Sequence, residues 1–146
     1  MNSVISIIIV NYNGASDTID CLESIYASNI SSKLRVVLID NSSVDSSIQE
    51  INNWLESNKF ERTLKFRLGQ IIDKQVICSD CDDFTDVFLK SDENYGFAMA
   101  NNIGISFAIQ RESKYIMLLN NDTVVDTAAL GHLFEYIEKN SVNVVI

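Results

Sequence analysis

The most restrictive feature of this chain is a run of isoleucine and valine close to its start. Residues 4–10 are apolar and β-branched except for Ser6. A strand with one face in water alternates polar and apolar residues, whereas a strand covered on both faces is almost continuously apolar. The run therefore predicts a strand that lies inside a sheet and is covered on both faces.

The segments after this strand alternate between helix and strand. Apolar residues at helical spacing predict a helix over about 16–28, with Ser16 or Asp17 as its cap. A second buried strand is predicted over 36–39, and the next helix begins near Ile48. Strands and helices in this order, joined by short connections, imply a parallel sheet with right-handed crossovers. We therefore predict an α/β fold with an open, mostly parallel sheet and helices on both of its faces.

Polar turns follow the first two strands. They cover residues 11–14 and 40–45, and they lie at the same edge of the predicted sheet. Ligands bind at the carboxyl ends of the strands in sheets of this kind. Neither turn has the glycine patterns of dinucleotide-binding or P-loop proteins. A ligand at this edge would therefore be held in another way.

The segment 56–83 is the least regular part of the chain. It is rich in charged residues and contains one glycine and two of the three cysteines. Within it, 64–72 and 75–77 are interpreted either as an additional hairpin or as an irregular loop. The next short strand is predicted over 86–90.

The three cysteines do not suggest a disulfide framework, because their number is odd and the chain has no secretion signal. Cys78 and Cys81 have the C-x-x-C spacing of redox and zinc sites, but there is no second pair and His132 is the only histidine. We therefore expect two free thiols in an inserted loop. Cys21 is expected on the buried side of the first helix.

A helix is predicted over 96–110, because apolar residues recur every four positions from Met99. Asn101 and Asn102 are unusual in the interior of a helix. Two interpretations stand for each of them. The carboxamide faces a binding site, or the side chain points into solvent.

Another apolar strand, predicted over 115–119, ends at Asn120, Asn121 and Asp122. At the carboxyl end of a buried parallel strand, this carboxylate lies where a ligand, or a metal attached to a ligand, is expected. The same residue types are also favoured in ordinary turns. The stretch alone does not decide between a site and a turn.

The last part of the chain predicts one more helix and one more strand. Thr127 is expected to cap the helix, and the β-branched residues at 142–146 predict the start of the strand. The 146 residues are enough for one domain with a core. We treat 1–146 as a single α/β domain with an inserted segment at about 56–83.

Charge and hydropathy restrict the partners and the location. The net charge of −9 argues against a nucleic-acid partner. A ligand with phosphates would need local cations, most simply a divalent metal held by carboxylates. No apolar run reaches the roughly 18 residues of a membrane-spanning helix, and the start of the chain lacks the basic stretch of a secretion signal. The expected location is the cytoplasm, with a peripheral position at the inner face of the membrane as the alternative.

Four motifs occur in an order that resembles a known family. Together they resemble the amino-terminal, donor-binding part of the family 2 inverting glycosyltransferases with the GT-A fold, and most of all its rhamnosyltransferase-like branch, which builds bacterial surface polysaccharides. The resemblance covers nearly the whole chain except about 56–83, which is longer than usual. The motifs are Ser-Ile-Ile-Ile-Val-Asn-Tyr-Asn-Gly, Val-Val-Leu-Ile-Asp-Asn-Ser-Ser-Val-Asp, Asn-Tyr-Gly-Phe-Ala-Met-Ala-Asn-Asn-Ile-Gly and Leu-Leu-Asn-Asn-Asp-Thr.

The resemblance implies a nucleotide site in the first two motifs. Tyr12 matches the aromatic residue that packs against the base, and Asn13 lies in the same turn. Asp40 matches the carboxylate that hydrogen-bonds the base, and Asp45 closes that loop. The nucleotide would thus be bound between the turns that follow the first and second strands.

The resemblance also implies a site for the donor sugar and diphosphate. Asn94, Gly96 and Asn101 match the segment that lines them. Asn120 and Asp122 occupy the D-x-D position, where Asp122 matches the metal-bound carboxylate and Asn120 replaces the first aspartate. The implied cofactor is Mg²⁺ or Mn²⁺, since these ions bind one or two carboxylates together with substrate phosphates.

The implied reaction is the transfer of a sugar, with inversion, from a nucleotide-diphospho-sugar to a hydroxyl of a saccharide or lipid-linked saccharide. It needs a general base. In the family this base lies beyond the D-x-D region, and no residue of this chain is nominated for it. We therefore expect a fold truncated at its carboxyl end, without the acceptor-binding half. The alternatives are a sugar nucleotidyltransferase and a non-catalytic module that binds nucleotide sugars or forms homo-oligomers.

Overall fold

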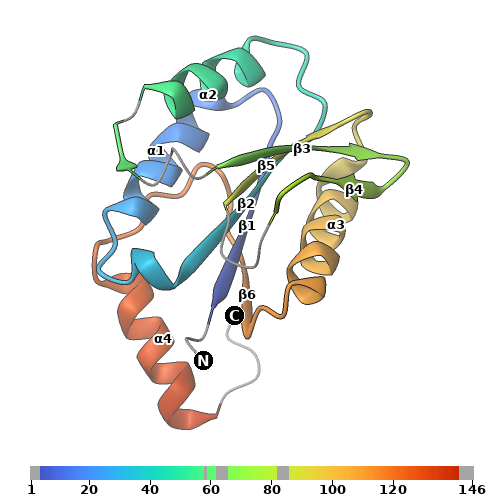
Figure 1. Cartoon of the computed structure of the whole chain (residues 1–146). Helices are drawn as coiled ribbons and strands as arrows, with labels where there is room; N and C mark the ends of the chain where they lie inside the picture. Colours follow the sequence, from blue (N-terminus) through green and yellow to red (C-terminus); the bar gives the residue numbers. More distant parts are fainter. Residues whose placement is uncertain (1–3, 58, 62–65, 82–85, 142–146) are drawn as a thin grey trace.

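The computed structural model describes residues 4–57, 59–61, 66–81 and 86–141. One sheet crosses the domain, and helices lie on both of its faces (Figure 1). In chain order, the elements are β1 (Ile5–Asn11), α1 (Ala15–Tyr26), η1 (Ser31–Lys33), β2 (Leu34–Asp40), α2 (Ser47–Glu56), β3 (Arg67–Ile72), β4 (Gln75–Ile77), β5 (Val87–Ser91), α3 (Gly96–Gln110), β6 (Tyr115–Leu118) and α4 (Ala129–Asn140). The predicted α/β fold is confirmed.

The strands follow the order β4-β3-β5-β2-β1-β6. All neighbouring pairs are parallel except β3 and β4. The register pairs Asn11 of β1 with Asp40 of β2, and Ile8 of β1 with Leu118 of β6. The carboxyl ends of β2, β1 and β6 therefore lie next to one another at one edge of the sheet.

The core has two layers, one on each face of the sheet. β1 and β2 are buried along their whole length, as their apolar sequences predict. Ile7 and Ile9 pack with residues of α1 and α2, whereas Ile8 and Val10 pack with α3 on the other face. This division explains why the sequence of β1 shows no alternation.

Gly104 allows α3 to lie close to the sheet. A Cβ atom at this position would lie 2.6 Å from Cγ2 of Ile8 and 3.2 Å from Cδ1 of Ile39. A larger residue would push the helix away from β1. Because α3 begins near the carboxyl edge of the sheet, this contact also fixes where its first turn lies.

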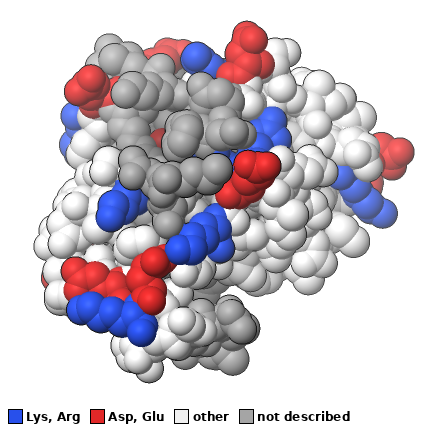
Figure 2. Space-filling model, turned by 60° about the horizontal axis from the view of Figure 1, so that its bottom comes forward, with Lys and Arg blue, Asp and Glu red and all other residues white. Residues whose placement is uncertain are grey.

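The helix α4 packs beside η1, where Nζ of Lys33 lies 5.2 Å from the centroid of the Phe134 ring, and beside the start of β6. Lys114 Nζ lies 2.7 Å from Oε1 of Glu138, and the rings of Tyr115 and Phe134 meet edge to face with centroids 6.0 Å apart. Acidic and basic side chains lie next to one another on the face of the molecule shown in Figure 2. In these contacts α4 binds to the edge strand β6 through one ion pair and one aromatic pair.

Several predicted bounds are confirmed. The helix predicted over 96–110 is α3, and the strands predicted over 4–10, 36–39 and 86–90 are correct within two residues. The strand predicted over 142–146 lies outside the described residues. Among the residues that are described, no helix is long and apolar enough to span a membrane.

The predicted cap of the first helix is wrong. The helix α1 begins at Ala15, its N-cap is Gly14, and no side chain caps it. Ala15 is buried in the core, while Ser16 and Asp17 are exposed in the first turn. The burial of Ala15 brings the start of the helix forward, so that neither polar residue reaches the cap position.

The predicted cap of the last helix is also wrong. The N-cap of α4 is Ala128. Oδ1 of Asp126 accepts a hydrogen bond from the backbone N–H of Ala128 at 2.9 Å. The carbonyl of Thr127 instead accepts a bond from the backbone N–H of Asn29 at 3.0 Å. Thr127 thus joins this turn to the loop after α1.

The inserted segment contains a hairpin, which confirms one of the two interpretations. β3 and β4 pair antiparallel and form the outer edge of the sheet. The expectation of two free thiols is wrong, because Cys78 and Cys81 are joined by a disulfide. The left-handed backbone of Asp80 (φ 56°) turns the chain back, and the two Cα atoms lie 6.1 Å apart, within the usual range for a disulfide.

Candidate functional site

Four loops meet at the carboxyl edge of the sheet. The loops over 12–14, 41–46 and 119–128 follow β1, β2 and β6, and the loop over 92–95 leads from β5 into α3. The topology therefore brings together the four motifs that lie far apart in the sequence. Every predicted site residue except Asn101 lies in one of these loops or directly beside one.

Asp40 is fully buried and joins the loops after β1 and β2. Its Oδ1 accepts hydrogen bonds from Nδ2 of Asn11 at 2.8 Å and from Oγ of Ser43 at 2.6 Å. Its Oδ2 accepts a bond from the backbone N–H of Ser43 at 2.9 Å. A buried carboxylate is tolerated when it accepts several bonds of this kind. Asp40 thus positions two loops, and its contact with a nucleotide base stays a prediction.

Asn13 ties the turn after β1 to the loop after β2. Its Oδ1 accepts bonds from the backbone N–H groups of Val44 at 2.9 Å and Asp45 at 3.4 Å. Its own backbone N–H donates to Oγ of Ser43 at 2.9 Å. Tyr12, next to it, is 47% exposed. The side chain of Asn13 is thus used within the protein, while the ring of Tyr12 is open to a ligand.

Asp45 is exposed and lies just before α2. Its Oδ1 accepts a bond from the backbone N–H of Ser47 at 2.8 Å. The nearby side chain of Ser47, and then its backbone N–H, lower the pKa of Asp45. The carboxylate therefore stays ionised and helps to hold the first turn of α2.

Asn94 and Asn41 hold the start of α3 against β2. Nδ2 of Asn41 donates to Oδ1 of Asn94 at 2.9 Å, and the same oxygen accepts a bond from the backbone N–H of Gly96 at 2.8 Å. The backbone N–H of Tyr95 donates to Oδ1 of Asn41 at 3.0 Å. Gly96 has φ +75°, a conformation that L residues rarely adopt. The helix therefore begins at a position set by these amides.

Asn101 lies one turn further along α3 and is buried. Its Nδ2 donates to the carbonyl of Phe97 at 3.0 Å. The interpretation in which Asn101 points into solvent is therefore wrong. Asn102, in contrast, is exposed. A contact of Asn101 with the donor sugar or diphosphate stays a prediction.

Asn121 anchors the loop after β6. Its Nδ2 donates to Oγ1 of Thr18 at 3.1 Å, and Oγ1 of Thr18 donates to Oδ1 of Asn11 at 2.7 Å. The chain of hydrogen bonds thus continues through Asn11 to the buried carboxylate described above. Asn120 and Asp122, on either side of the anchor, are exposed.

The pKa of Cys21 depends on its burial and on the charge of this loop. Its side chain is fully buried on α1, as predicted, and Sγ lies 3.8 Å from the carbonyl oxygen of Asn120. Burial, and then the negative charge of Asp122, raise the pKa of Cys21 to about 12. The carboxylate of Asp122 is therefore close enough to α1 to act electrostatically on the Cys21 thiol.

Asp122 is also the predicted metal ligand. Within the described part of the chain, no group of three or more His, Cys, Asp and Glu side chains could hold a metal ion. One exposed carboxylate beside an amide fits a cation that takes its other oxygen ligands from a diphosphate and water. The residues at this edge thus suit a metal that binds together with a ligand. Its binding here stays a prediction.

Sequence reasoning missed the residues that connect the loops. Asn11, Thr18 and Asn41 are buried, and they link the carboxylate, the helix starts and the loop after β6. A signal for two of them was present, because Asn11 and Asn41 stand where an apolar strand ends. Buried polar side chains need partners, so these positions indicate a network even though they do not show its members.

The profile of glycosyl transferase family 2 matches residues 73–146, about half of the chain, including α3 and the loop after β6. The chain belongs to this family. The family inferred from the four motifs is thereby confirmed. A comparison with curated protein sequences found no match.

Solved glycosyltransferase structures share the fold. The mannosyltransferase PcManGT from Pyrobaculum calidifontis, in complex with GDP-Man and Mn²⁺, superimposes with a TM-score of 0.69 at 18% identity, over 97% of this chain and 34% of that one. TarS 1–349 from S. aureus, in complex with UDP-GlcNAc, gives 0.65 at 16% identity, over 94% of this chain and 32% of that one. This chain thus has the GT-A fold and spans about a third of the length of each.

Proposed function

We propose that this chain is the donor-binding domain of a glycosyltransferase that uses a nucleotide-diphospho-sugar. One observation carries the proposal. The four loops that hold the family motifs meet at the carboxyl edge of the sheet, and side-chain hydrogen bonds link three of them through Asn11, Thr18 and Asp40. A ligand at this edge meets loops that the protein itself has already positioned, which lowers the cost of ordering them on binding.

The nucleotide is assigned to the turns after β1 and β2. The exposed ring of Tyr12 stacks on the base, beside Asn13, and Asp40 and Asp45 complete the loop that receives it. Among the described residues, Oδ2 of Asp40 accepts a hydrogen bond from the backbone N–H of Ser43, and a carboxylate oxygen can accept more than one. This capacity supports a contact between Asp40 and the edge of the base.

The donor sugar and diphosphate are assigned to the start of α3 and the loop after β6. Asn94, Gly96 and Asn101 lie at or near the amino end of α3, where backbone N–H groups favour a negatively charged ligand. Asn120 and Asp122 lie on the exposed side of their loop and hold Mg²⁺ or Mn²⁺ together with the diphosphate. The metal, when bound, neutralises charge on the diphosphate. The net charge of −9 supports the need for such a cation beside the phosphates.

The finer assignments follow from the family resemblance. We infer transfer with inversion to a hydroxyl of a saccharide or lipid-linked saccharide, in the synthesis of bacterial surface polysaccharides, by a rhamnosyltransferase-like enzyme in the cytoplasm at the inner face of the membrane. No residue of this chain is assigned as the general base. We assign donor binding to this domain.

Calorimetric titration with UDP-, GDP- and dTDP-sugars, with and without Mn²⁺, tests the assignment. We expect one of these donors to bind more tightly when Mn²⁺ is present. Asp122→Asn should weaken the binding measured with Mn²⁺ by about 10–100-fold, since a metal ligand is lost. Glu135→Gln, on the exposed face of α4, removes the same charge and should change nothing.

The variant Tyr12→Ala distinguishes the contribution of the base to binding from that of the metal. It should weaken binding with and without Mn²⁺ by about tenfold or more, because stacking of a base on an aromatic ring contributes about 1–3 kcal/mol. Equal donor affinity of the wild type and Asp122→Asn in Mn²⁺ would contradict the role of this carboxylate. Failure of all three donors to bind would contradict the proposed function as a whole.

A further inference from the structure

A cavity lies between the β3–β4 hairpin and α3. Its volume is about 480 Å³, which is within the range of roughly 300–1,000 Å³ that small-molecule sites have. None of its described lining residues belongs to the predicted donor site. The lining residues are Lys74, Gln75, Val76, Cys78, Met99, Asn102, Ile103, Ser106, Phe107, Gln110 and Arg111.

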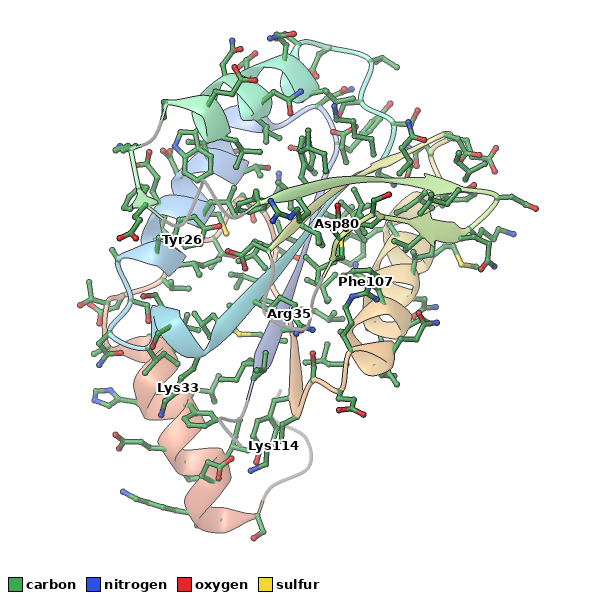
Figure 3. All side chains as sticks on the ribbon, in the orientation of Figure 1. Tyr26, Lys33, Arg35, Asp80, Phe107 and Lys114 are labelled. Carbon is green, nitrogen blue, oxygen red and sulfur yellow. A yellow bond between two sulfur atoms is a disulfide. The ribbon has the colours of Figure 1, made fainter. Side chains whose placement is uncertain are left out.

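The cavity is a groove with one helical wall. Its residues on α3 recur at intervals of three and four, from Met99 to Gln110, so they form one side of the helix. Residues of the turn and of β4 form the opposite wall. Figure 3 shows Phe107 pointing from α3 toward the sheet, which makes its ring part of the floor.

A cation lies at each end of this groove. The backbone N–H of Lys74 donates to Oη of Tyr95, just before α3, at 3.2 Å, so Lys74 lies at the amino end of the helix. Arg111 is the C-cap of the same helix. A rise of about 1.5 Å per residue separates the backbones of Met99 and Arg111 by about 18 Å. The groove is therefore elongated, with positive charge at both ends.

Neither cation makes an ion pair with any described residue. No carboxylate occurs among the described residues that line the groove, although acidic residues outnumber basic ones by 20 to 11 in the chain. In a protein of this charge, a groove with two cations and no described acid selects an anion.

Arg111 is held in place with hydrogen-bonding capacity left over. Its guanidinium carbon lies 3.9 Å from the centroid of the Phe107 ring, and Nη2 donates to the carbonyl of Cys81 at 3.5 Å. Its Nε is buried and has no hydrogen-bond partner. A guanidinium that is stacked and only partly bonded is ready to bind an anionic oxygen.

The side chains between the two cations are uncharged. Amides and a hydroxyl, from Gln75, Asn102, Ser106 and Gln110, alternate with the apolar side chains of Val76, Met99 and Ile103. Amides and hydroxyls suit the hydroxyl groups of a sugar, and apolar side chains suit the C–H face of its ring. We propose that this groove binds an elongated saccharide that carries negatively charged groups. The groove reaches the 92–95 loop at its Lys74 end, but none of its described lining residues is assigned to the donor site. The proposal therefore does not depend on the function proposed there.

Titration with three saccharides tests the proposal. Trigalacturonate carries a carboxylate on each sugar, maltotriose is neutral and of the same length, and glucose 1,6-bisphosphate carries phosphates at opposite ends. We expect trigalacturonate or the bisphosphate to bind at least about tenfold more tightly than maltotriose, and the difference to shrink in 0.5 M salt. The better of the two anions identifies carboxylate or phosphate as the charged group.

Variants locate the binding. Lys74 has φ +61°, a conformation that asparagine tolerates, so Lys74→Asn removes the charge without straining the turn. Lys74→Asn and Arg111→Gln should each weaken binding of the anionic saccharide about tenfold, whereas Arg111→Lys should weaken it less. Asp122→Asn, at the donor edge, and Lys33→Gln, on η1, should leave it unchanged.

Three results would overturn the proposal. One is equal affinity for maltotriose and for both anionic saccharides. Another is a loss of anion binding in Asp122→Asn with none in Lys74→Asn, which would place the ligand at the donor edge. The third is binding of triglutamate as tight as that of trigalacturonate, which would make the groove a site for acidic peptides.

Discussion

The carboxyl edge of the sheet and the groove beside α3 use their polar side chains in opposite ways. At the edge, Asn11, Thr18 and Asp40 are buried and bonded to one another. In the groove, Lys74 and Arg111 lie at a surface and have no ionic partner among the described residues. The first arrangement positions loops, and the second leaves charge available to a ligand.

The difference shows how one small domain can carry two kinds of site. At the edge, a buried layer fixes the backbone, and the exposed residues Tyr12 and Asp122 are carried on it. A fixed layer reduces the ordering cost of binding. The proposed specificity of the groove comes from its two cations and from the exposed amides and hydroxyl and the apolar side chains between them. Mutations in the buried layer should therefore cost stability, whereas mutations in the groove should cost only affinity.

Thiol reactivity gives the largest contrast between the two regions. Cys21 lies beside the edge, and its pKa is raised from 9.0 to about 12. The thiol therefore stays protonated at every pH below that value, and its thiolate fraction at pH 8 is about a thousandfold below that of an ordinary cysteine. We expect iodoacetamide to alkylate native Cys21 about a thousandfold more slowly, as measured by mass spectrometry.

Cys78 and Cys81, beside the groove, provide the comparison for this measurement. Without reductant they are protected by their disulfide. After mild reduction, their thiols should react at the rate of exposed cysteines. Alkylation of Cys21 at that same rate in the folded protein would show that the loop after β6 does not seal this part of α1.

Asp40→Ala should cost the most stability. It removes the acceptor of the part-buried N–H of Ser43 and the shorter of the two hydrogen bonds made by the buried Nδ2 of Asn11. Each unsatisfied buried group costs about 1–3 kcal/mol, so we expect the free energy of unfolding in urea to fall by about 3 kcal/mol. Asp20→Ala, exposed on α1, and Lys74→Asn, in the groove, should each change it by less than about 0.5 kcal/mol. A similar loss of unfolding free energy in all three variants would show that the buried layer at the edge is no more important for stability than the groove.

Gly104→Ala tests the helix that both regions share. The added methyl group meets Ile8 and Ile39 at less than the usual contact distance, and overpacking of this kind costs about 1–3 kcal/mol. Because the displaced helix carries Gly96 at one end and Arg111 at the other, ligand binding should weaken in both regions. Ala108→Gly, on the same buried face, loosens the helix without pushing it and serves as the control. Unchanged stability in Gly104→Ala would show that α3 can shift freely.

Glu23 lies outside both regions and should have the smallest effect. Hydrogen bonds from Lys59 and then from Trp54 lower the pKa of Glu23 below 4.5. A carboxyl group with a lowered pKa contributes stability above its unfolded pKa and loses it as the pH falls through the folded one. We expect Glu23→Gln to cost less than about 1 kcal/mol at pH 7. Measured by urea unfolding, the difference in free energy of unfolding between wild type and Glu23→Gln should vanish in strong acid. A difference that grows as the pH falls would contradict the stabilising role of the ionised carboxylate.

The sequence predicted those parts of the fold that depend on burial alone. The mostly apolar sequences of β1 and β2 indicate that both faces of each strand are covered. This can be recognised without knowing which helices cover them. The bounds of α3 were also predictable, because Gly96 begins the helix and its apolar residues keep one spacing to the end. The carboxyl ends of the strands, and hence the edge at which ligands are expected, followed from these elements.

Features that depend on contacts between distant segments could not be predicted. The cap expected at Thr127 failed because its carbonyl bonds Asn29 instead. The bond between Asn121 and Thr18 requires β6 to lie beside β1, and nothing local in the sequence gives that strand order. The disulfide of Cys78 and Cys81 depended on one left-handed residue, Asp80. Local sequence patterns determine where helices and strands form. The order of the strands in the sheet determines which side chains meet in the hydrogen-bond network at its carboxyl edge.

The position of β1 has a consequence for how the chain folds. Its neighbour on one side, β2, begins at Leu34, but its neighbour on the other side, β6, begins only at Tyr115. Closing so long a loop is slow and entropically unfavourable. β1 precedes both of its neighbours in the chain, yet it is completed only when β6 has been made. Until β6 docks, the open side of β1 can pair with the same strand of another copy, so a chain that stops before Tyr115 should aggregate.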